Sequence, residues 1–326
     1  MVIYLDIHNK RRNINRIMFV PLLAVLLVLS ACSSPAQTAP TGQQPGGDQL
    51  KVLATTTIVA DVVSQVGGDL IELSVLLPVG TDPHSFDPTP QDISKVSEAD
   101  LVFVNGAGLE EFLDNLIESA GVQDRVIQVS DGIEFLELDA EGDEHDNDHD
   151  GVNPHTWTDP NNVFTWTSNI AQALSKLDPE NAGTYHANAQ AYQVELKTLD
   201  AWIRDQVGSI PTENRKLVTD HELFGYFAEE YGFEQVGALI PGYSTLAEPT
   251  AQELAEIEDA IQELDVKAVF VGNTVNPTLA ERVSEDTGIQ LVFVYTGSLD
   301  DSGNDAGTYI DYMRYNTKAF VEALTP

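Results

Sequence analysis

The sequence predicts an α/β protein of two lobes, each with a mainly parallel four-stranded sheet flanked by helices, joined by one long backbone helix. Two observations carry this prediction. Short apolar runs alternate with segments of helical pattern, an alternation typical of parallel sheets covered by helices. The same rhythm then occurs a second time, after a long stretch with the periodicity of one helix.

Residues 1–31 have the pattern of a lipoprotein signal peptide. A basic segment precedes an apolar run from Ile17 to Leu29, which is shorter than the roughly 20 residues of a spanning helix. The run ends in Leu-Ser-Ala-Cys, a match to the bacterial lipobox in which Cys32 is acylated; the alternative is a signal anchor with an incidental cysteine. We therefore expect an extracytoplasmic protein, lipid-anchored to the cell membrane on its periplasmic or outer face.

Cys32 is the sole cysteine, so the sequence excludes an intrachain disulfide and a zinc site of several thiolates. Residues 32–49 are rich in Ser, Pro, Gly, Gln and Thr, which predicts a flexible tether. We expect an N-terminal lobe over 50–160, a helical linker over 161–210 and a C-terminal lobe over 211–326.

Four strands are expected in each lobe. Those of the first are Lys51–Thr55, Leu73–Leu77, Leu101–Asn105 and Arg125–Val129, and those of the second are Lys216–Thr219, Gln235–Leu239, Ala268–Val271 and Leu291–Tyr295. The best-marked helix of the second lobe begins after Pro249, where Thr250 and Glu253 fit a capping box.

The long helix is predicted from Pro179 to Val207. Its apolar residues recur every three or four positions, at Tyr185, Ala189, Tyr192, Leu196, Leu199 and Ile203. A helix of this length extends about 40 Å, so it can act as a stiff spine along both lobes. Such a spine permits small tilts of the lobes rather than wide hinge closure.

The formal net charge of −36 argues against binding of nucleic acid through a basic surface. The acidity has two interpretations, general solubility or a field that concentrates cations near the protein. Total charge does not locate a binding site.

Three histidines have unusual surroundings. His84 follows a predicted strand in Asp-Pro-His, His155 precedes a predicted helix in Asn-Pro-His, and His221 lies at a strand end. Ligands of open α/β sheets bind beyond the carboxyl ends of strands, so we expect His84 and His221 to face each other across the cleft. Neutral imidazoles suit zinc, copper, iron or nickel. Each histidine alone is more typical of a turn residue.

Acidic residues near these histidines have two interpretations. Asp82, Asp87 and Asp159 are close enough in sequence to orient the ring nitrogens, or they form turns and helix caps.

The chain resembles the solute-binding lipoproteins of zinc and manganese ABC importers, the ZnuA/TroA-like family. The matching segments are DPHSFDPTPQD, ADLVFVNGAGLEEFLD, NPHTWTDP, TDHELFGYFAEEYG, IPGYSTLAEPTAQEL and TYIDYMRYN, in family order. The resemblance implies two α/β lobes joined by a backbone helix, with the metal at their interface and His84, His155 and His221 as its first three ligands.

The third ligand position separates metal preferences in the family. Manganese-type members carry Glu there, whereas this chain has His221, which favours zinc over manganese. Two acidic positions of the family are glycines here, Gly272 and Gly297. The fourth ligand is therefore water, or Asp300 or Asp301 from the following loop.

An acidic segment over 141–150 contains His145 and His149. Its composition predicts a mobile loop, and zinc-type members of the family often have a His-rich loop at this place. Auxiliary metal capture by these two histidines and a simple solvated loop remain equal alternatives.

Together, these features predict a non-enzymatic, monomeric binding protein that captures zinc and delivers it to the membrane permease of an ABC importer. Release would follow from tilting of the lobes or from protonation of imidazoles. The alternatives are a manganese- or iron-binding role, an adhesin role, and a three-His zinc hydrolase with Glu222 as general base. The hydrolase is disfavoured because neighbouring strand residues point opposite ways and no His-Glu-x-x-His motif is present.

Overall fold

The computed structural model describes residues 49–137 and 151–326, which belong to one compact unit, Asp48–Pro326. Several predictions concern residues outside these ranges and stay predictions. They are the signal peptide, the acylated Cys32 with nearly all of the tether that it begins, and His145 and His149. Across the described ranges, every helix is too short or too polar to cross a membrane.

The first lobe is built on a fully parallel sheet with strand order β2-β1-β3-β4. Residues on the two faces of its central strands pack against different helices: α1 covers the face of Val52 and Phe103, and α2 and α3 cover the face of Leu53 and Val102. The elements are β1 (Leu50–Ala54), α1 (Thr57–Gly67), β2 (Ile71–Val75), α2 (Pro90–Glu98), β3 (Leu101–Val104), α3 (Leu113–Ala120) and β4 (Val126–Gln128).

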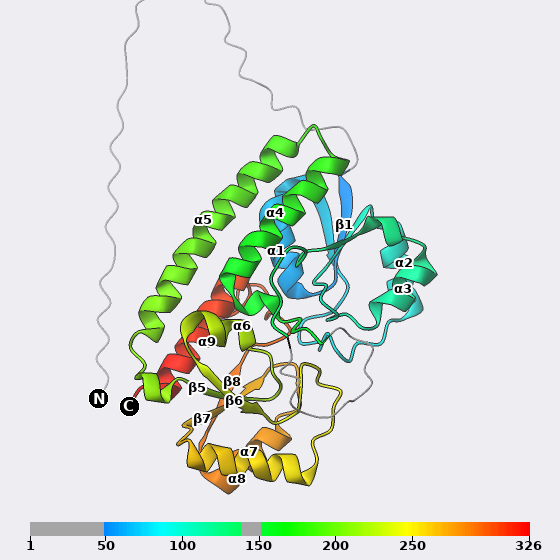
Figure 1. The fold of residues 1–326 in the computed structure, drawn as a ribbon. Helices are drawn as coiled ribbons and strands as arrows, with labels where there is room; N and C mark the ends of the chain where they lie inside the picture. Colours follow the sequence, from blue (N-terminus) through cyan, green and yellow to red (C-terminus); the bar gives the residue numbers. More distant parts are fainter. Residues whose placement is uncertain (1–48, 138–150) are drawn as a thin grey trace, which may run out of the picture. The chain divides into compact units, whose positions relative to one another are not determined.

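The second lobe repeats this order in a second parallel sheet, β6-β5-β7-β8. Val218 and Val269 face α7 and α8, whereas Leu217 and Phe270 face α6 and α9 (Figure 1). The elements are β5 (Lys216–Thr219), α6 (Gly225–Tyr231), β6 (Glu234–Ala238), α7 (Ala251–Glu263), β7 (Ala268–Gly272), α8 (Thr278–Thr287), β8 (Gln290–Val294) and α9 (Tyr309–Leu324).

The predicted fold class is confirmed. Each of the eight predicted strands is present, with its ends within two residues of those expected. The proposed lobe boundaries after residues 160 and 210 remain predictions, because both lobes fall within one compact unit.

Two helices connect the sheets, α4 (Pro160–Leu177) and α5 (Ala182–Val207). Helix α5 contacts α1 of the first lobe and α6 and α9 of the second, and Figure 1 shows it running alongside both. It is the predicted spine, but it begins at Ala182 rather than Pro179. The reason is a turn in which the Asp178 carboxylate accepts hydrogen bonds from Asn181 Nδ2 (2.7 Å) and the Tyr185 hydroxyl (2.8 Å).

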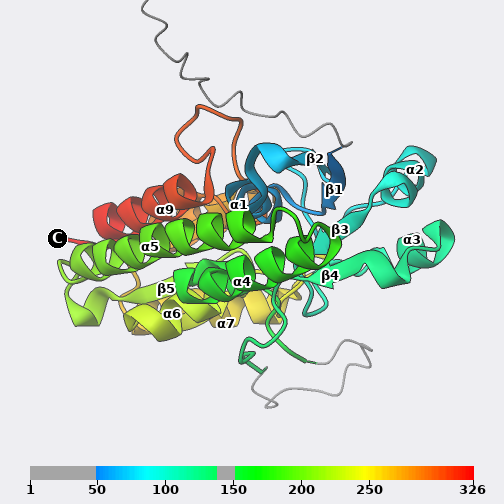
Figure 2. The same ribbon diagram turned by 90° about the horizontal axis from the view of Figure 1, so that it is seen from above.

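The lobes share one hydrophobic core. The buried faces of α1, α4, α5 and α9 belong to a single cluster that continues from Val52 in the first sheet to Phe270 in the second. Seen from above, α4, α5 and α9 lie in a row beside the sheets (Figure 2). A continuous core of this kind opposes wide separation of the lobes, because separation would expose apolar surface to water.

Asp159 precedes α4 and caps it. Its carboxylate accepts a hydrogen bond from the Asn161 backbone nitrogen (2.8 Å). The residue is 8% exposed. Burial raises the pKa of Asp159 to about 6, and Glu230 and Asp200 add to this effect. The charged carboxylate therefore destabilises the fold at neutral pH.

Leu196 and Val194 test the spine. Leu196 of α5 is 1% exposed and Val194, on the opposite face, is 64% exposed. Leu196→Ala is expected to lower the free energy of unfolding by about 2–5 kcal/mol, and Val194→Ala to change it by less than about 0.5 kcal/mol. Urea unfolding of both variants measures the difference, and equal losses would show that α5 is not packed along this face.

Asp159→Asn keeps a capping side chain but removes the charge. In the wild type, the folded state holds a proton on Asp159 between pH 3.8 and about 6 that the unfolded state has released. Stability from this group is thus complete below pH 3.8 and is lost as pH rises through 6, by up to about 3 kcal/mol. We expect the variant to gain stability relative to wild type between pH 4 and pH 7, as measured by urea unfolding at both values. A stability difference between variant and wild type that is the same at both pH values would contradict this expectation.

Candidate metal centre

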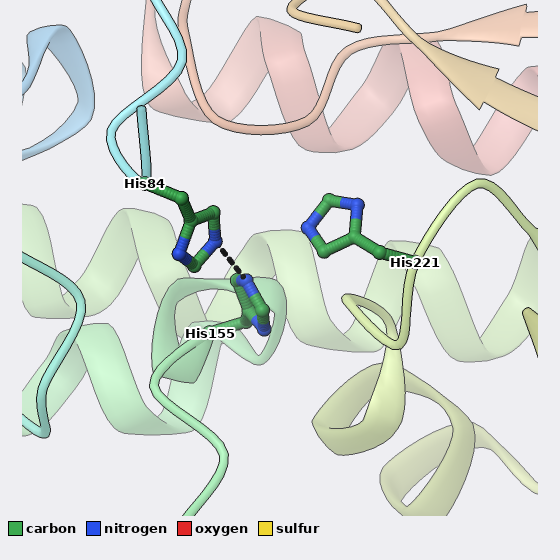
Figure 3. Close-up of side chains that lie close together, drawn as sticks. All are labelled: His84, His155 and His221. Atoms are coloured by element: carbon green, nitrogen blue, oxygen red, sulfur yellow. Dashed lines mark hydrogen bonds between the residues drawn. The ribbon is translucent and has the colours of Figure 1, made fainter. Parts of the chain in front are cut away.

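Three buried histidines meet between the two sheets: His84, His155 and His221 (Figure 3). One nitrogen from each ring lies within 4.8 Å of the others. The Nε2 atoms of His84 and His155 are 3.1 Å apart. The structure thus brings together three residues that are at least 66 positions apart along the chain.

The backbone of the loop after β2 holds His84. The Asp82 carboxylate accepts a hydrogen bond from the His84 backbone nitrogen (3.0 Å). Pro83 lies between these two residues, and its ring restricts the backbone there. The same carboxylate accepts hydrogen bonds from Ser85 Oγ (3.1 Å) and from the Thr245 hydroxyl of the second lobe. Asp82 thus fixes the loop rather than the His84 ring.

Asn153 orients His155. Its Oδ1 accepts from the His155 backbone nitrogen (3.0 Å) and lies 2.9 Å from the ring Nδ1. Both lobes hold the backbone of this segment by hydrogen bonds. Asn105 Nδ2 of the first lobe donates to the Pro154 carbonyl (2.9 Å), and the Tyr226 hydroxyl of the second donates to the Asn153 carbonyl (2.7 Å). An Nδ1–H donated to Asn153 leaves the Nε2 lone pair directed into the site.

His221 follows β5, at the carboxyl end of the second sheet. Its Nδ1 is hydrogen-bonded to the Asp220 carboxylate, and its Nε2 points toward the other two histidines (Figure 3). Within the described residues this Nε2 is buried and has no hydrogen-bond partner. A buried polar atom without a partner costs about 1–3 kcal/mol, which suits a site whose partner is a bound ion.

Burial keeps the first two rings neutral. Burial and, to a smaller extent, the neighbouring His221 lower the pKa of His84 to about 4, against the opposite effects of Asp82 and Asp220. Burial, with His221 and His84, also lowers the pKa of His155 well below its usual value. Neutral imidazole is the form that binds metal. Protonation of these two rings in mild acid is therefore disfavoured as a release mechanism.

Beside the three histidines, the pocket is lined by Asp82, Pro83, Trp157, Leu223, Thr274 and Gly297. A Cβ atom on Gly297 would lie 2.7 Å from Pro83 Cδ, so a side chain there requires the His84 loop to move. The sequence offered Asp300 and Asp301 as fourth ligands, but neither lines the pocket. Asp300 accepts a hydrogen bond from the Tyr295 hydroxyl (2.7 Å), and Asp301 is exposed.

The ring-orienting residues differ from those suggested by the sequence. Asp82 binds backbone and hydroxyl groups, Asp87 is exposed, and Asp159 caps α4. Asn153 and Asp220 contact the rings instead. Both lie within two residues of a histidine in the quoted motifs, but sequence proximity alone does not show which side chain turns toward a ring.

Comparison with known proteins identifies the family of this chain. The family model described as zinc-uptake complex component A periplasmic matches residues 52–323. The manganese-binding lipoprotein MntA of Halalkalibacterium halodurans is 36% identical over 302 residues, covering 92% of this chain and 97% of the relative. The manganese ABC transporter substrate-binding lipoprotein PsaA of Streptococcus mitis is 33% identical over 314 residues, covering 94% and 97%.

Solved structures give the same result. The periplasmic zinc-binding protein TroA of Treponema pallidum superposes with a TM-score of 0.77 at 27% identity, covering 85% of this chain and 100% of that one. A manganese-bound variant of a periplasmic metal-binding protein from Candidatus Liberibacter asiaticus has a TM-score of 0.74 at 26% identity, with the same coverage. The long connecting helix and the two parallel sheets belong to this fold.

These matches span nearly all of the folded unit. They confirm the family resemblance and the prediction of a binding protein rather than an enzyme, since the family consists of solute-binding proteins. The chain belongs to the ZnuA/TroA-like family of extracytoplasmic metal-binding proteins that serve ABC importers.

Proposed function

We propose that the chain binds zinc through the Nε2 atoms of His84, His155 and His221 and delivers it to the permease of an ABC importer. The observation that carries this proposal is the convergence of three buried imidazole nitrogens. Three histidines with an open fourth position form a well-known type of zinc site.

The donor set favours zinc over manganese. Manganese prefers carboxylate, carbonyl and water oxygens, whereas imidazole suits zinc. Across the described residues, the metal-competent group at this site contains nitrogen donors and no carboxylate. Gly297 supplies no side chain on the fourth side, so water is the proposed fourth ligand.

Manganese is the second candidate, because the relatives MntA and PsaA are named for manganese. Their names describe those proteins, and the ligands of this chain need not be the same. Metal content therefore has to be measured on this protein directly.

The proposed release mechanism is a tilt of the lobes. His84 lies beyond β2 of the first sheet and His221 beyond β5 of the second, so a bound ion would bridge the lobes. A small relative displacement lengthens the bond to one of these residues while the shared core stays closed. Docking to the permease would supply the energy for this displacement, and Cys32 acylation would keep the protein at the membrane.

Metal analysis of the protein purified from its own envelope tests the site. We expect one zinc ion per chain, and a loss of zinc affinity of more than about 100-fold in each of His84→Ala, His155→Ala and His221→Ala, since even changes outside the ligand set cost 10–100-fold. Competition titration with a chromophoric chelator measures the affinities.

His186→Ala is the matched control. His186 is exposed on α5 and far in sequence from the site, with Ser175 Oγ 3.4 Å from its Nε2. Its replacement is expected to leave zinc affinity unchanged. Manganese in the native protein would overturn the zinc assignment, and zinc binding that survives all three site substitutions would overturn the site.

A further inference from the structure

Asp220 is a buried carboxylate behind the third histidine. The residue is 3% exposed and lies between the end of β5 and the end of β7. One of its oxygens accepts hydrogen bonds from the His221 backbone nitrogen (2.7 Å) and from His221 Nδ1. The other accepts from the Gly272 backbone nitrogen. Three donors therefore converge on one carboxylate.

Gly272 makes this arrangement sterically feasible. A Cβ atom at this position would lie 2.9 Å from Asp220 Oδ2 and 2.1 Å from Thr296 Oγ1. The absence of a side chain lets the β7 backbone approach the carboxylate closely. The family often has an acidic residue at the position of Gly272. In this chain the backbone nitrogen of Gly272 instead holds the carboxylate of Asp220.

The carboxylate determines which nitrogen of His221 carries the proton. An ionised carboxylate only accepts hydrogen bonds, so the ring must donate from Nδ1 and keep its lone pair on Nε2. That Nε2 is one of the buried side-chain atoms of the described residues that have no hydrogen-bond partner. The Nδ1 atom of the His155 ring is instead hydrogen-bonded to the neutral amide of Asn153.

The charge of Asp220 also acts across the site. Three neutral imidazoles bring no negative charge to a divalent cation, and Gly297 removes the family's acidic ligand. Two carboxylates favour positive charge at His84: Asp82, which lines the pocket and has the larger effect, and Asp220. The oxygens of Asp82 are bonded to backbone and hydroxyl groups, whereas Asp220 contacts a ring.

We propose that Asp220 is a positioning residue of the metal site: it holds His221 in the Nδ1–H tautomer with Nε2 aimed at the cation. This inference rests on the proposed function, because it assigns His221 as a ligand. It differs from a purely structural role, since it makes the ring tautomer depend on Asp220.

Asp220→Asn tests the proposal. The amide has one acceptor oxygen where the carboxylate serves three donors, and its NH₂ group opposes either Gly272 N–H or His221 Nδ1–H. We expect zinc affinity to fall by about 10- to 100-fold and the Nδ1–H tautomer of His221 to lose population. Titration against a chelator gives the affinity, and ring ¹⁵N resonances of histidine-labelled, metal-free protein give the tautomer.

Asp82→Asn is the matched control, because it removes one negative charge beside the same pocket without removing a ring acceptor. It is expected to leave the His221 tautomer unchanged. The His221 resonances are assigned by their disappearance in His221→Ala. Urea unfolding of the Asn variants shows that both are folded.

Two results would overturn the proposal. One is a metal-free wild type with the His221 proton on Nε2, a measurement that needs no variant to fold. The other is a folded Asp220→Asn protein with wild-type zinc affinity and tautomer. Failure of the wild type to bind zinc at all would instead contradict the proposed function, so the two failures are distinguishable.

Discussion

The structure depends on one constraint: three neutral imidazole nitrogens must be held together in a buried pocket before any ion arrives. Each ring loses hydration there, and the His221 Nε2 has no protein partner in the described residues. Buried polar atoms in that state are costly. The hydrogen bonds that Asn153 accepts from the His155 ring and Asp220 accepts from the His221 ring offset this cost by fixing the second nitrogen of two rings.

The fold supplies the rigidity that this constraint requires. Both sheets are parallel with the same strand order, and His84 and His221 follow the carboxyl ends of β2 and β5, one strand of each sheet. A common apolar core along α1, α4, α5 and α9 keeps the lobes together. The Tyr309 hydroxyl donates to the Trp157 carbonyl (2.8 Å), and the Tyr312 hydroxyl accepts from Trp157 Nε1 (3.1 Å), which ties the segment after His155 to α9 of the second lobe. Such a body can tilt by small amounts without opening.

Much of this arrangement could be predicted from the sequence. Strand positions follow from local apolar runs, and α5 from its three-to-four periodicity, because these signals are local. The three histidines could be selected because motifs surround each of them. The partners of their rings could not be predicted: the sequence offered Asp82, Asp87 and Asp159 either as ring partners or as turn and cap residues, and did not indicate Asp220. Tertiary packing shows that Asp82 binds backbone groups while Asp220 contacts a ring. The steric demand at Gly297 comes from Pro83, more than 200 residues away, so no local pattern reveals it.

The central claim is that nitrogen donors of three histidines bind the ion, and X-ray absorption of the metal-loaded native protein tests it most directly. The account predicts a zinc edge and a shell containing three imidazole nitrogens at about 2.0–2.1 Å, with one oxygen donor as the fourth ligand. A manganese edge, or a zinc shell made mainly of oxygen atoms without the outer scattering of imidazole rings, would contradict the account.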